Sequence, residues 1–306
     1  MILCAGEALI DMLPRETTDG EAAFAPYPGG AVFNTSVALG RLGVETQLFT
    51  GLSRDLFGQR LEAALSASGV GADLAARSDR PTTLAFVTLT DGHAQYAFYD
   101  EGTAGRMLSE ADLPSDLAGV SALFFGGISL AVTPCADAYA ALCLREAARV
   151  PVMIDPNIRP SFIADAPAYR ARIAKMIAVA DIIKVSDEDL HWLEGAGDAD
   201  ALAALMLARG PKLVCITRGA EGVTAYTAKG RVHVAAQRAD VVDTVGAGDT
   251  FNAGLLAGLA QAGLLKKEAV ADLPEDGLRA ALSLGARAAA ITVSRAGANP
   301  PWAAEL

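Results

Sequence analysis

The chain has 306 residues, with 25 Lys and Arg against 36 Asp and Glu, which gives a formal net charge of −11. This length allows one large domain with a sizeable core, and the 52% apolar and 20% charged residues exclude a disordered chain. The acidic balance, with a sequence pI near 4.8, argues against a protein that binds nucleic-acid phosphates, because such proteins are basic.

Short apolar runs alternate with amphipathic stretches along the whole chain. The runs predict buried strands at residues 2–5, 47–51, 122–126, 152–155, 181–185 and 213–217. The stretches between them predict helices at residues 31–42, 58–66, 137–148, 169–180, 199–208, 250–262 and 277–291. This alternation predicts a mainly parallel sheet covered on both faces. Ligands of such sheets bind beyond the carboxyl ends of the strands.

Two runs at residues 82–89 and 94–99 interrupt this series with a different, alternating pattern. They are joined by Asp91-Gly92-His93, and Asp-Gly between alternating runs is a strong hairpin signal. We interpret the hairpin as a flap over a site, to which the polar stretch 14–28 could add a second part; the alternative is a plain edge hairpin. A second hairpin is predicted within residues 222–235.

No stretch is typical of a membrane span or a leader peptide. The longest weakly charged stretch, 250–265, is too short to cross a bilayer. The first residues include Glu7 and Asp11 in place of a basic segment, so we expect no signal peptide. The four cysteines are far apart and have no metal-binding spacing, which predicts reduced thiols in a cytoplasmic protein with no membrane partner.

The segment 241–254, Val-Val-Asp-Thr-Val-Gly-Ala-Gly-Asp-Thr-Phe-Asn-Ala-Gly, carries the most chemistry. A β-like run ends at Thr244, Gly246-Ala247-Gly248 follows without bulky side chains, and a helix begins near Asp249. Free N–H groups at the positive end of that helix would bind an anion, especially phosphate. Asp249 either caps the helix or accepts a proton from a hydroxyl beside the phosphate. The role of base does not require a raised pKa of Asp249, because a carboxylate at a positive helix end stays ionised.

The same tetrapeptide occurs a second time, at Gly195-Ala-Gly-Asp198. There it follows the end of a helix, so its glycines predict a C-cap and Asp198 an N-cap. The β-like run before residues 246–249 is therefore what favours a phosphate site at that copy.

A second glycine segment lies at residues 28–43. Gly29 and Gly30 precede a helix whose first turn contains Asn34, so backbone N–H groups and a side-chain amide could bind hydroxyls. The alternative is an ordinary entry from a loop into a helix. Asp11 ends the first apolar segment, where a carboxylate could bind two adjacent hydroxyls or belong to a turn.

Several common catalytic motifs are missing from the sequence. It contains no GxxxxGKS/T and no GxGxxG after a predicted strand, which argues against a Walker-type NTPase and a dinucleotide oxidoreductase. It also lacks HExxH, GxSxG and the HRD and DFG pair. A packed α/β domain whose glycines are all structural remains an alternative.

In this order and at this separation, the two glycine segments resemble the ribokinase-like (PfkB) family of carbohydrate kinases, over essentially the whole chain. The resemblance implies one domain, residues 1–306, with a three-layer α/β/α sandwich, a mainly parallel sheet and a small β lid at about 12–28 and 80–106. It implies transfer of the γ-phosphate of MgATP to a sugar hydroxyl. A catalytically silent, sugar-sensing relative is the alternative from another class.

The resemblance also implies roles for individual residues. Asp249 takes the place of the catalytic base, and the anion hole would be formed by Gly246, Ala247 and Gly248. The sugar would be bound by Asp11, Gly29, Gly30, Asn34, Tyr99 and Arg159. The nucleotide would be bound by Lys184, Ser186, Thr217, Gly219 and Gly222. Residues 184–189 resemble the family's Asn-x-x-Glu segment, which shapes the shell of Mg²⁺ and phosphate; here Ser186 replaces Asn and Asp189 replaces Glu, so Asp189 takes the position in the Mg²⁺ shell. A monovalent-cation site, for K⁺, would include Asp243 and Val245.

Within the family the chain is most similar to bacterial fructokinases, which make fructose 6-phosphate. That similarity is carried by residues 6–11, 98–104 and 155–160. The nearest alternative is 2-keto-3-deoxygluconate kinase, which has an Arg after an aromatic pair like Phe98-Tyr99 to hold the substrate carboxylate. This chain has Asp100 there, which would repel a carboxylate and therefore favours a neutral sugar. Arg159 and Arg106 could still bind an acidic substrate, so that alternative stays open. Family members often pair their lids across a homodimer, and the 83–89 edge could do so.

Overall fold

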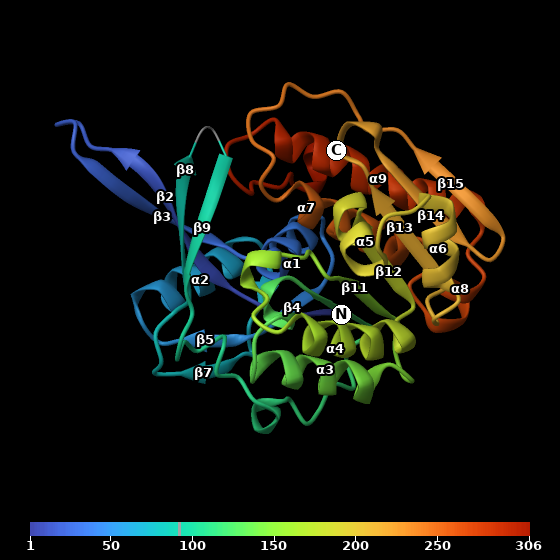
Figure 1. Cartoon of the computed structure of the whole chain (residues 1–306), viewed down its shortest axis with the longest axis horizontal. Coiled ribbons are helices and arrows are strands. Elements are labelled where there is room, and N and C mark those ends of the chain that lie inside the picture. Colours follow the sequence, from blue (N-terminus) through green and yellow to red (C-terminus); the bar gives the residue numbers. More distant parts are fainter. Residues whose placement is uncertain (91–92) are drawn as a thin grey trace.

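The computed structural model describes residues 1–90 and 93–306 (Figure 1). Its central sheet has nine strands in the order β15-β14-β13-β12-β11-β10-β1-β4-β6. They are β1 (Ile2–Ala5), β4 (Thr46–Phe49), β6 (Val70–Gly71), β10 (Ala122–Gly126), β11 (Val152–Asp155), β12 (Ile182–Ser186), β13 (Leu213–Thr217), β14 (Val223–Thr227) and β15 (Gly230–Val234). From β6 at one edge to β13, neighbouring strands of this sheet pair in parallel. Strand β14 pairs antiparallel with both β13 and β15.

Helices cover both faces of this sheet and bury two apolar clusters. Strand β1 shows the alternation: Ile2 and Cys4 belong to one cluster, Leu3 and Ala5 to the other. The first cluster lies under α1 (Ala31–Arg41), α2 (Leu56–Ala67), α7 (Ala247–Gln261), α8 (Lys267–Ala271) and α9 (Glu275–Val293). The second lies under α3 (Cys135–Glu146), α4 (Ala166–Val179), α5 (Asp187–Glu194) and α6 (Ala199–Leu207). The predicted three-layer α/β/α sandwich is confirmed.

A smaller four-stranded sheet has the order β3-β2-β8-β9. It contains β2 (Leu9–Glu16), β3 (Ala22–Gly29), β8 (Leu84–Thr90) and β9 (His93–Tyr99), and two further strands, β5 (Gly51–Ser53) and β7 (Ala76–Ser78), pair by themselves. The polar stretch and the predicted hairpin thus join in one sheet, and β2 and β3 diverge from β8 and β9 at their far ends (Figure 1). The predicted turn residues Asp91 and Gly92 lie outside the described residues.

The 83–89 segment lies mostly in β8, which is an inner strand of this sheet. Strand β8 pairs in parallel with β2 over Ile10–Met12 and antiparallel with β9 along its length. The edge strands are β3 and β9, but β2 reaches only Leu84–Phe86 of β8, so beyond Phe86 the side of β8 that faces away from β9 pairs with no strand among the described residues. Pairing of this segment across a dimer stays a prediction.

The predicted β-like run at residues 241–244 is wrong. This segment is a loop in which Val241 and Val242 are 66% and 64% exposed. The N–H of Val242 donates to the carbonyl of Val293 at 2.8 Å, so the loop lies against the end of α9 instead of pairing with a strand. By contrast, Gly195 is the C-cap of α5 and Asp198 the N-cap of α6, as predicted.

Small residues hold α7 tightly against α9. A Cβ atom on Gly254 would lie 2.5 Å from the Cα of Gly285, and one on Gly258 would lie 2.6 Å from the Cα of Ala281. Glycine at these two positions thus allows the backbones of the two helices to approach closely. No helix in the described part of the chain is long and apolar enough to cross a membrane.

Candidate active site

A cavity of about 300 Å³ opens between the four-stranded sheet and the N-terminal end of α7. It lies beyond the carboxyl ends of the central strands, where α/β sheets bind ligands. Nine of the residues singled out from the sequence line it: Asp11, Gly30, Asn34, Arg159, Lys184, Val245, Gly246, Gly248 and Asp249. The two glycine segments therefore meet around one space, although more than 200 residues separate them along the chain.

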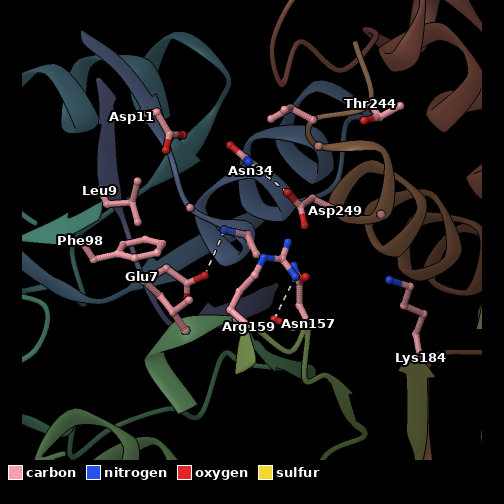
Figure 2. A pocket seen from close by; sticks show the side chains of 17 residues that line it. Glu7, Leu9, Asp11, Asn34, Phe98, Asn157, Arg159, Lys184, Thr244 and Asp249 are labelled. Carbon is pink, nitrogen blue, oxygen red and sulfur yellow. Dashed lines mark hydrogen bonds between the residues drawn. The ribbon is translucent and has the colours of Figure 1, made fainter. Parts of the chain in front are cut away.

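Asp249 is the third residue of α7 and does not cap it. The N-cap is Gly246, whose φ of 77° is in the left-handed region that favours glycine. The buried Asp249 side chain faces the cavity, where its Oδ2 accepts a hydrogen bond from Nδ2 of Asn34 at 3.0 Å (Figure 2). The hydroxyl of Thr35 donates to the backbone carbonyl of Asp249 at 3.3 Å. Helix α1 thus holds both the carboxylate and the backbone of this residue.

Burial raises the pKa of Asp249 from its ordinary 3.8 to about 7. The hydrogen bond from Asn34 lowers this pKa, the charge of Asp155 raises it, and Lys184 lowers it. The pKa is thus raised although the role of base does not require it, because loss of water outweighs the positive helix end. A carboxylate with a pKa near 7 matches the requirement of a general base near neutral pH.

The first turn of α7 presents backbone N–H groups that have no partner within the helix. The N–H of Ala247 donates to the carbonyl of Thr244 at 3.3 Å, and Ala247 does not line the cavity, whereas Gly246 and Gly248 do. The N–H groups of Gly248 and Asp249 are therefore the ones placed for an anion.

Lys184 brings a positive charge to the same end of the cavity. Its Nζ atom lies 3.1 Å from where a Cβ on Gly248 would be, and it donates to Oδ2 of Asp155 at 2.9 Å. That oxygen also accepts from Nδ2 of Asn252 at 2.7 Å. Burial would lower the pKa of Lys184, but the charge and hydrogen bond of Asp155 raise it above its ordinary value. The ammonium therefore stays charged although it is buried.

Asp11 and the glycines of the first segment form the opposite wall. Burial raises the pKa of Asp11 to about 6. A Cβ on residue 29 would lie 2.1 Å from Oδ2 of Asp11, so Gly29 leaves room for this carboxylate. Gly30 has a φ of 104°, which an L side chain rarely adopts. Asp11, Asn34 and Asp249 all point into the same space (Figure 2).

The structure places Tyr99 outside this cavity. Successive side chains of a strand point to opposite faces, and it is Phe98 that lines the cavity. Tyr99 is 64% exposed and packs edge-on against Phe86 with ring centroids 5.3 Å apart. The four-stranded sheet thus contributes Leu9, Asp11 and Phe98 to the cavity, and not Tyr99.

Asp100 does not face the cavity either. Each of its carboxylate oxygens accepts a hydrogen bond at 3.1 Å from Nη1 of Arg106. The repulsion of an acidic substrate by Asp100 is therefore not supported, because the charge is paired elsewhere. Arg159 does line the cavity, where it donates to the carbonyl of Ile158 at 3.0 Å. Within the described part of the chain, Arg159 has no ion pair.

The other positions assigned to the nucleotide lie at the neighbouring strand ends. Thr217 is the last residue of β13, and Gly219 and Gly222 bound the turn that leads into β14. Ser186 caps α5 by accepting from the N–H of Asp189 at 3.0 Å. The two oxygens of Asp189 accept from the backbone N–H groups of Ser186 and Ile158, at 3.4 and 3.0 Å. Of these residues, none lines the cavity.

Asp243 ties the loop before α7 to the loop after α9. Its two oxygens accept from the N–H groups of Val245, at 3.0 Å, and Gly297, at 2.9 Å. Val245 lines the cavity and Asp243 does not. Among residues 1–90 and 93–306, no group of three or more His, Cys, Asp and Glu side chains is placed to hold a metal ion.

The polar residues of the site without a role in the sequence prediction include Glu7 and Asn157, which line the cavity, and Asp155 and Asn252, which hydrogen-bond to each other next to Lys184. Glu7 and Asp155 stand at the carboxyl ends of β1 and β11, where a lone acidic residue after a buried strand is the available signal. Asn252 lies inside α7, and its partner Asp155 is 97 residues away. No local pattern indicates such a contact.

Comparisons with known proteins agree with this geometry. Residues 1–305 match the family model described as pfkB family carbohydrate kinase. The chain is 57% identical over 279 residues to a fructokinase from Rhizobium leguminosarum bv. trifolii, which covers 91% of this chain and 86% of the relative. The structure is similar to a fructokinase with bound ATP from Xylella fastidiosa, with a TM-score of 0.89, 30% identity and 97% and 93% coverage. It is also similar to aminoimidazole riboside kinase from Salmonella enterica, with a TM-score of 0.82, 27% identity and 97% and 94% coverage.

Proposed function

The chain belongs to the pfkB family of carbohydrate kinases, and we propose that its substrate is D-fructose, which it converts to fructose 6-phosphate with ATP. The 57% identical relative is named a fructokinase, and a solved fructokinase with 30% identity has ATP bound. Both support fructose as the acceptor and ATP as the donor. As a carbohydrate kinase, the protein is a phosphotransferase with an alcohol group as acceptor.

The environment of Asp249 is the observation that carries the proposed transfer of a phosphoryl group to a sugar hydroxyl. Its carboxylate faces the cavity, between the wall that contains Asp11 and Gly30 and the N-terminal end of α7. In our proposal, Asp249 accepts the proton of the primary hydroxyl as that oxygen bonds to the γ-phosphorus and the bond to the β-phosphate oxygen breaks. The pKa of about 7 leaves the carboxylate basic enough to take up this proton.

Groups at the other end of the cavity would stabilise the transferred charge. The N–H groups of Gly248 and Asp249 and the ammonium of Lys184 are the donors that face the phosphates. Both oxygens of Asp189 are bound by backbone N–H groups, so we propose that Mg²⁺ enters with the phosphates of ATP, with Asp189 in its outer shell. Bound Mg²⁺ would neutralise negative charge on the phosphates. K⁺ beside Asp243 and Val245 is the proposed monovalent cation.

The sugar would lie against Asp11, Gly29, Gly30, Asn34 and Arg159. We propose that the four-stranded sheet is the lid of a single domain, since it supplies Leu9 and Phe98 to the cavity wall. Closing this lid over the sugar would exclude water and suppress hydrolysis of ATP.

A second candidate substrate is 2-keto-3-deoxygluconate, which one observation favours. The guanidinium of Arg159 lines the cavity and, within the described part of the chain, has no carboxylate partner. A free guanidinium binds a carboxylate well. The two candidates share the fold and the base and differ in the group that meets Arg159.

Initial-rate ADP release tests the proposal. The panel contains fructose, ribose, tagatose, allulose, glucose and 2-keto-3-deoxygluconate, each with MgATP and K⁺ and beside a sugar-free blank. We expect fructose to give the highest kcat/KM. A preference for the keto acid would assign Arg159 to a substrate carboxylate. Folded protein that binds ATP but releases no sugar-dependent ADP would refute the kinase proposal in favour of a silent sensor. Replacing K⁺ by tetramethylammonium tests the cation site.

We also propose a cytoplasmic location and a homodimer that forms through the lid. All four cysteine thiols are free and buried, which suits a reducing compartment. The lid exposes Phe24, Tyr27 and Tyr99, and exposed aromatic residues are enriched where proteins associate. Light scattering on the wild type and on a Tyr27→Glu variant tests the dimer, which the charge should dissociate.

A further inference from the structure

Glu7 joins three segments that lie far apart in the sequence. It stands between β1 and β2, is 8% exposed and lines the cavity. Its Oε1 accepts from the N–H of Ala31, the first residue of α1, at 3.0 Å, and its Oε2 accepts from the N–H of Ser129 at 3.3 Å. Ser129 belongs to a 3₁₀ helix, Ile128–Leu130, that follows β10. The backbone carbonyl of Glu7 also accepts from the N–H of Phe33, at 3.2 Å.

These contacts provide hydrogen-bond acceptors for the first N–H groups of α1. The first N–H groups of a helix have no partner within it, and the N-cap of α1 is Gly30, which has no side chain to cap them. Glu7 supplies the missing acceptors with one side-chain oxygen and one backbone oxygen. It therefore fixes where α1 begins and how its first turn is oriented.

Two glycines with positive φ make the space for this carboxylate. A Cβ on Gly127, whose φ is 70°, would lie 1.9 Å from Oε1 of Glu7. A Cβ on Gly30 would lie 3.1 Å from Cγ of Glu7. The backbone on both sides of Glu7 is thus shaped to hold a side chain of this size in one position.

The fixed helix turn leads directly to Asp249. Asn34 follows Ala31 by three residues, and its N–H donates to the carbonyl of Gly30 at 2.8 Å within the same first turn. Its side-chain amide is the group that donates to Oδ2 of Asp249. A shift at the start of α1 would therefore move the Asn34 amide away from the carboxylate.

We propose that Glu7 is a positioning residue for phosphoryl transfer, which fixes the start of α1 and thereby holds Asn34 against Asp249. This inference rests on the proposed function, because it assigns the reacting carboxylate to Asp249. Both oxygens of Glu7 must accept hydrogen bonds. Glutamine has one acceptor oxygen and an NH₂ group that would face a backbone N–H, so it cannot keep both contacts.

A double-mutant cycle tests the coupling between Glu7 and Asn34. We expect Glu7→Gln to lower kcat/KM for the sugar by about 10- to 100-fold, as a misplacement near 1 Å does, with KM for MgATP changed less than about twofold. In the Asn34→Ala background, Glu7→Gln should lower kcat/KM for the sugar by less than about threefold further. The same full loss in both backgrounds would overturn the proposal, as would unchanged kinetics of the single Glu7→Gln variant.

Asp181→Asn is the matched control. Asp181 is also a buried carboxylate that accepts a backbone N–H, from Val152 at 2.9 Å, and it lies at the opposite end of the strands, where it also pairs with Lys267 at 2.8 Å. This variant should lose stability and keep its kcat/KM, so that loss of a buried carboxylate alone does not explain the Glu7 result. If Glu7→Gln does not fold, Glu7→Asp replaces it, because the shorter side chain keeps the charge but cannot reach both N–H groups.

A crystal structure of the Glu7 variant gives a readout that does not depend on activity. We expect the distance from Nδ2 of Asn34 to Oδ2 of Asp249 to increase from 3.0 Å to beyond hydrogen-bonding range. An unchanged distance would overturn the positioning role whatever the substrate is. The wild-type sugar panel decides the proposed function separately.

Discussion

Replacing Asp249 by asparagine should slow turnover and, at the same time, stabilise the fold. The pKa of this buried carboxyl is about 7, against an ordinary value of 3.8. The folded chain therefore binds the proton more tightly than the unfolded chain, and ionisation of Asp249 in the folded state opposes folding. Asparagine has nearly the same shape, can accept the hydrogen bond from Asn34, and carries no charge.

The size of this effect follows from the two pKa values. Each unit of difference corresponds to 1.36 kcal/mol, so the difference from 3.8 to about 7 makes the charged form unfavourable by as much as about 4 kcal/mol. The unfavourable energy is absent below pH 3.8, where both states are protonated, and complete above about pH 7. At pH 5 it is about 2 kcal/mol, and at pH 8 about 4 kcal/mol.

Urea unfolding of both proteins at pH 5 and pH 8 measures this difference. We expect Asp249→Asn to be more stable than the wild type at both values, with the larger margin at pH 8, while kcat is lower by about 10²–10⁴ and ATP affinity changes little. A margin that does not grow with pH would refute the argument from desolvation. Near-normal turnover of the variant would remove Asp249 from the role of base.

Other variants test separate parts of the site. Gly248→Ala places a methyl group 3.1 Å from Nζ of Lys184, so initial rates should show a lower kcat while the circular dichroism spectrum stays normal. An unchanged kcat would show that the end of the cavity proposed to bind the phosphates has room for this methyl group. Asp155→Asn leaves the buried Lys184 without its counter-charge and should destabilise the fold by about 3–5 kcal/mol in urea; a loss below about 1 kcal/mol would show that the ammonium finds another partner. Phe98→Ala should raise KM for the sugar more than Tyr99→Ala, because only Phe98 lines the cavity; equal effects would place both rings at the substrate.

The central sheet could be predicted because its strands are buried on both faces. Such strands are short, uniformly apolar and bounded by turn residues, and the predicted bounds of β1, β10, β11 and β13 are the observed ones. The β-like run at residues 241–244 begins with two valines but continues with Asp243 and Thr244, and among residues 1–90 and 93–306 no strand pairs with it. A strand needs a neighbour, and the neighbour is a property of the fold rather than of the run.

The site also contains some residues that could be predicted from the sequence and others that could not. Gly246 and Gly248 could be found because a turn that exposes several N–H groups needs small residues next to each other. Tyr99 and Asp100 could not be placed, because the choice between Phe98 and Tyr99 depends on which face of β9 covers the cavity, and the role of Asp100 depends on its contact with Arg106. A shift of one residue along a strand reverses every side chain.

The pKa of Asp249 shows why the chemistry of a residue depends on its surroundings as well as on its position in a helix. A helix N-terminus favours a carboxylate by about 0.3–1 kcal/mol, and by up to about 2 kcal/mol when partly buried, whereas full burial can raise a carboxyl pKa by about 3–5 units. Burial therefore wins, and Asn34 and Lys184 only moderate it. In the role proposed for Asp249, the loss of water that makes this carboxylate unfavourable for folding would also make it basic enough to accept a proton from a sugar hydroxyl, so stability would be lost at this position in exchange for catalysis.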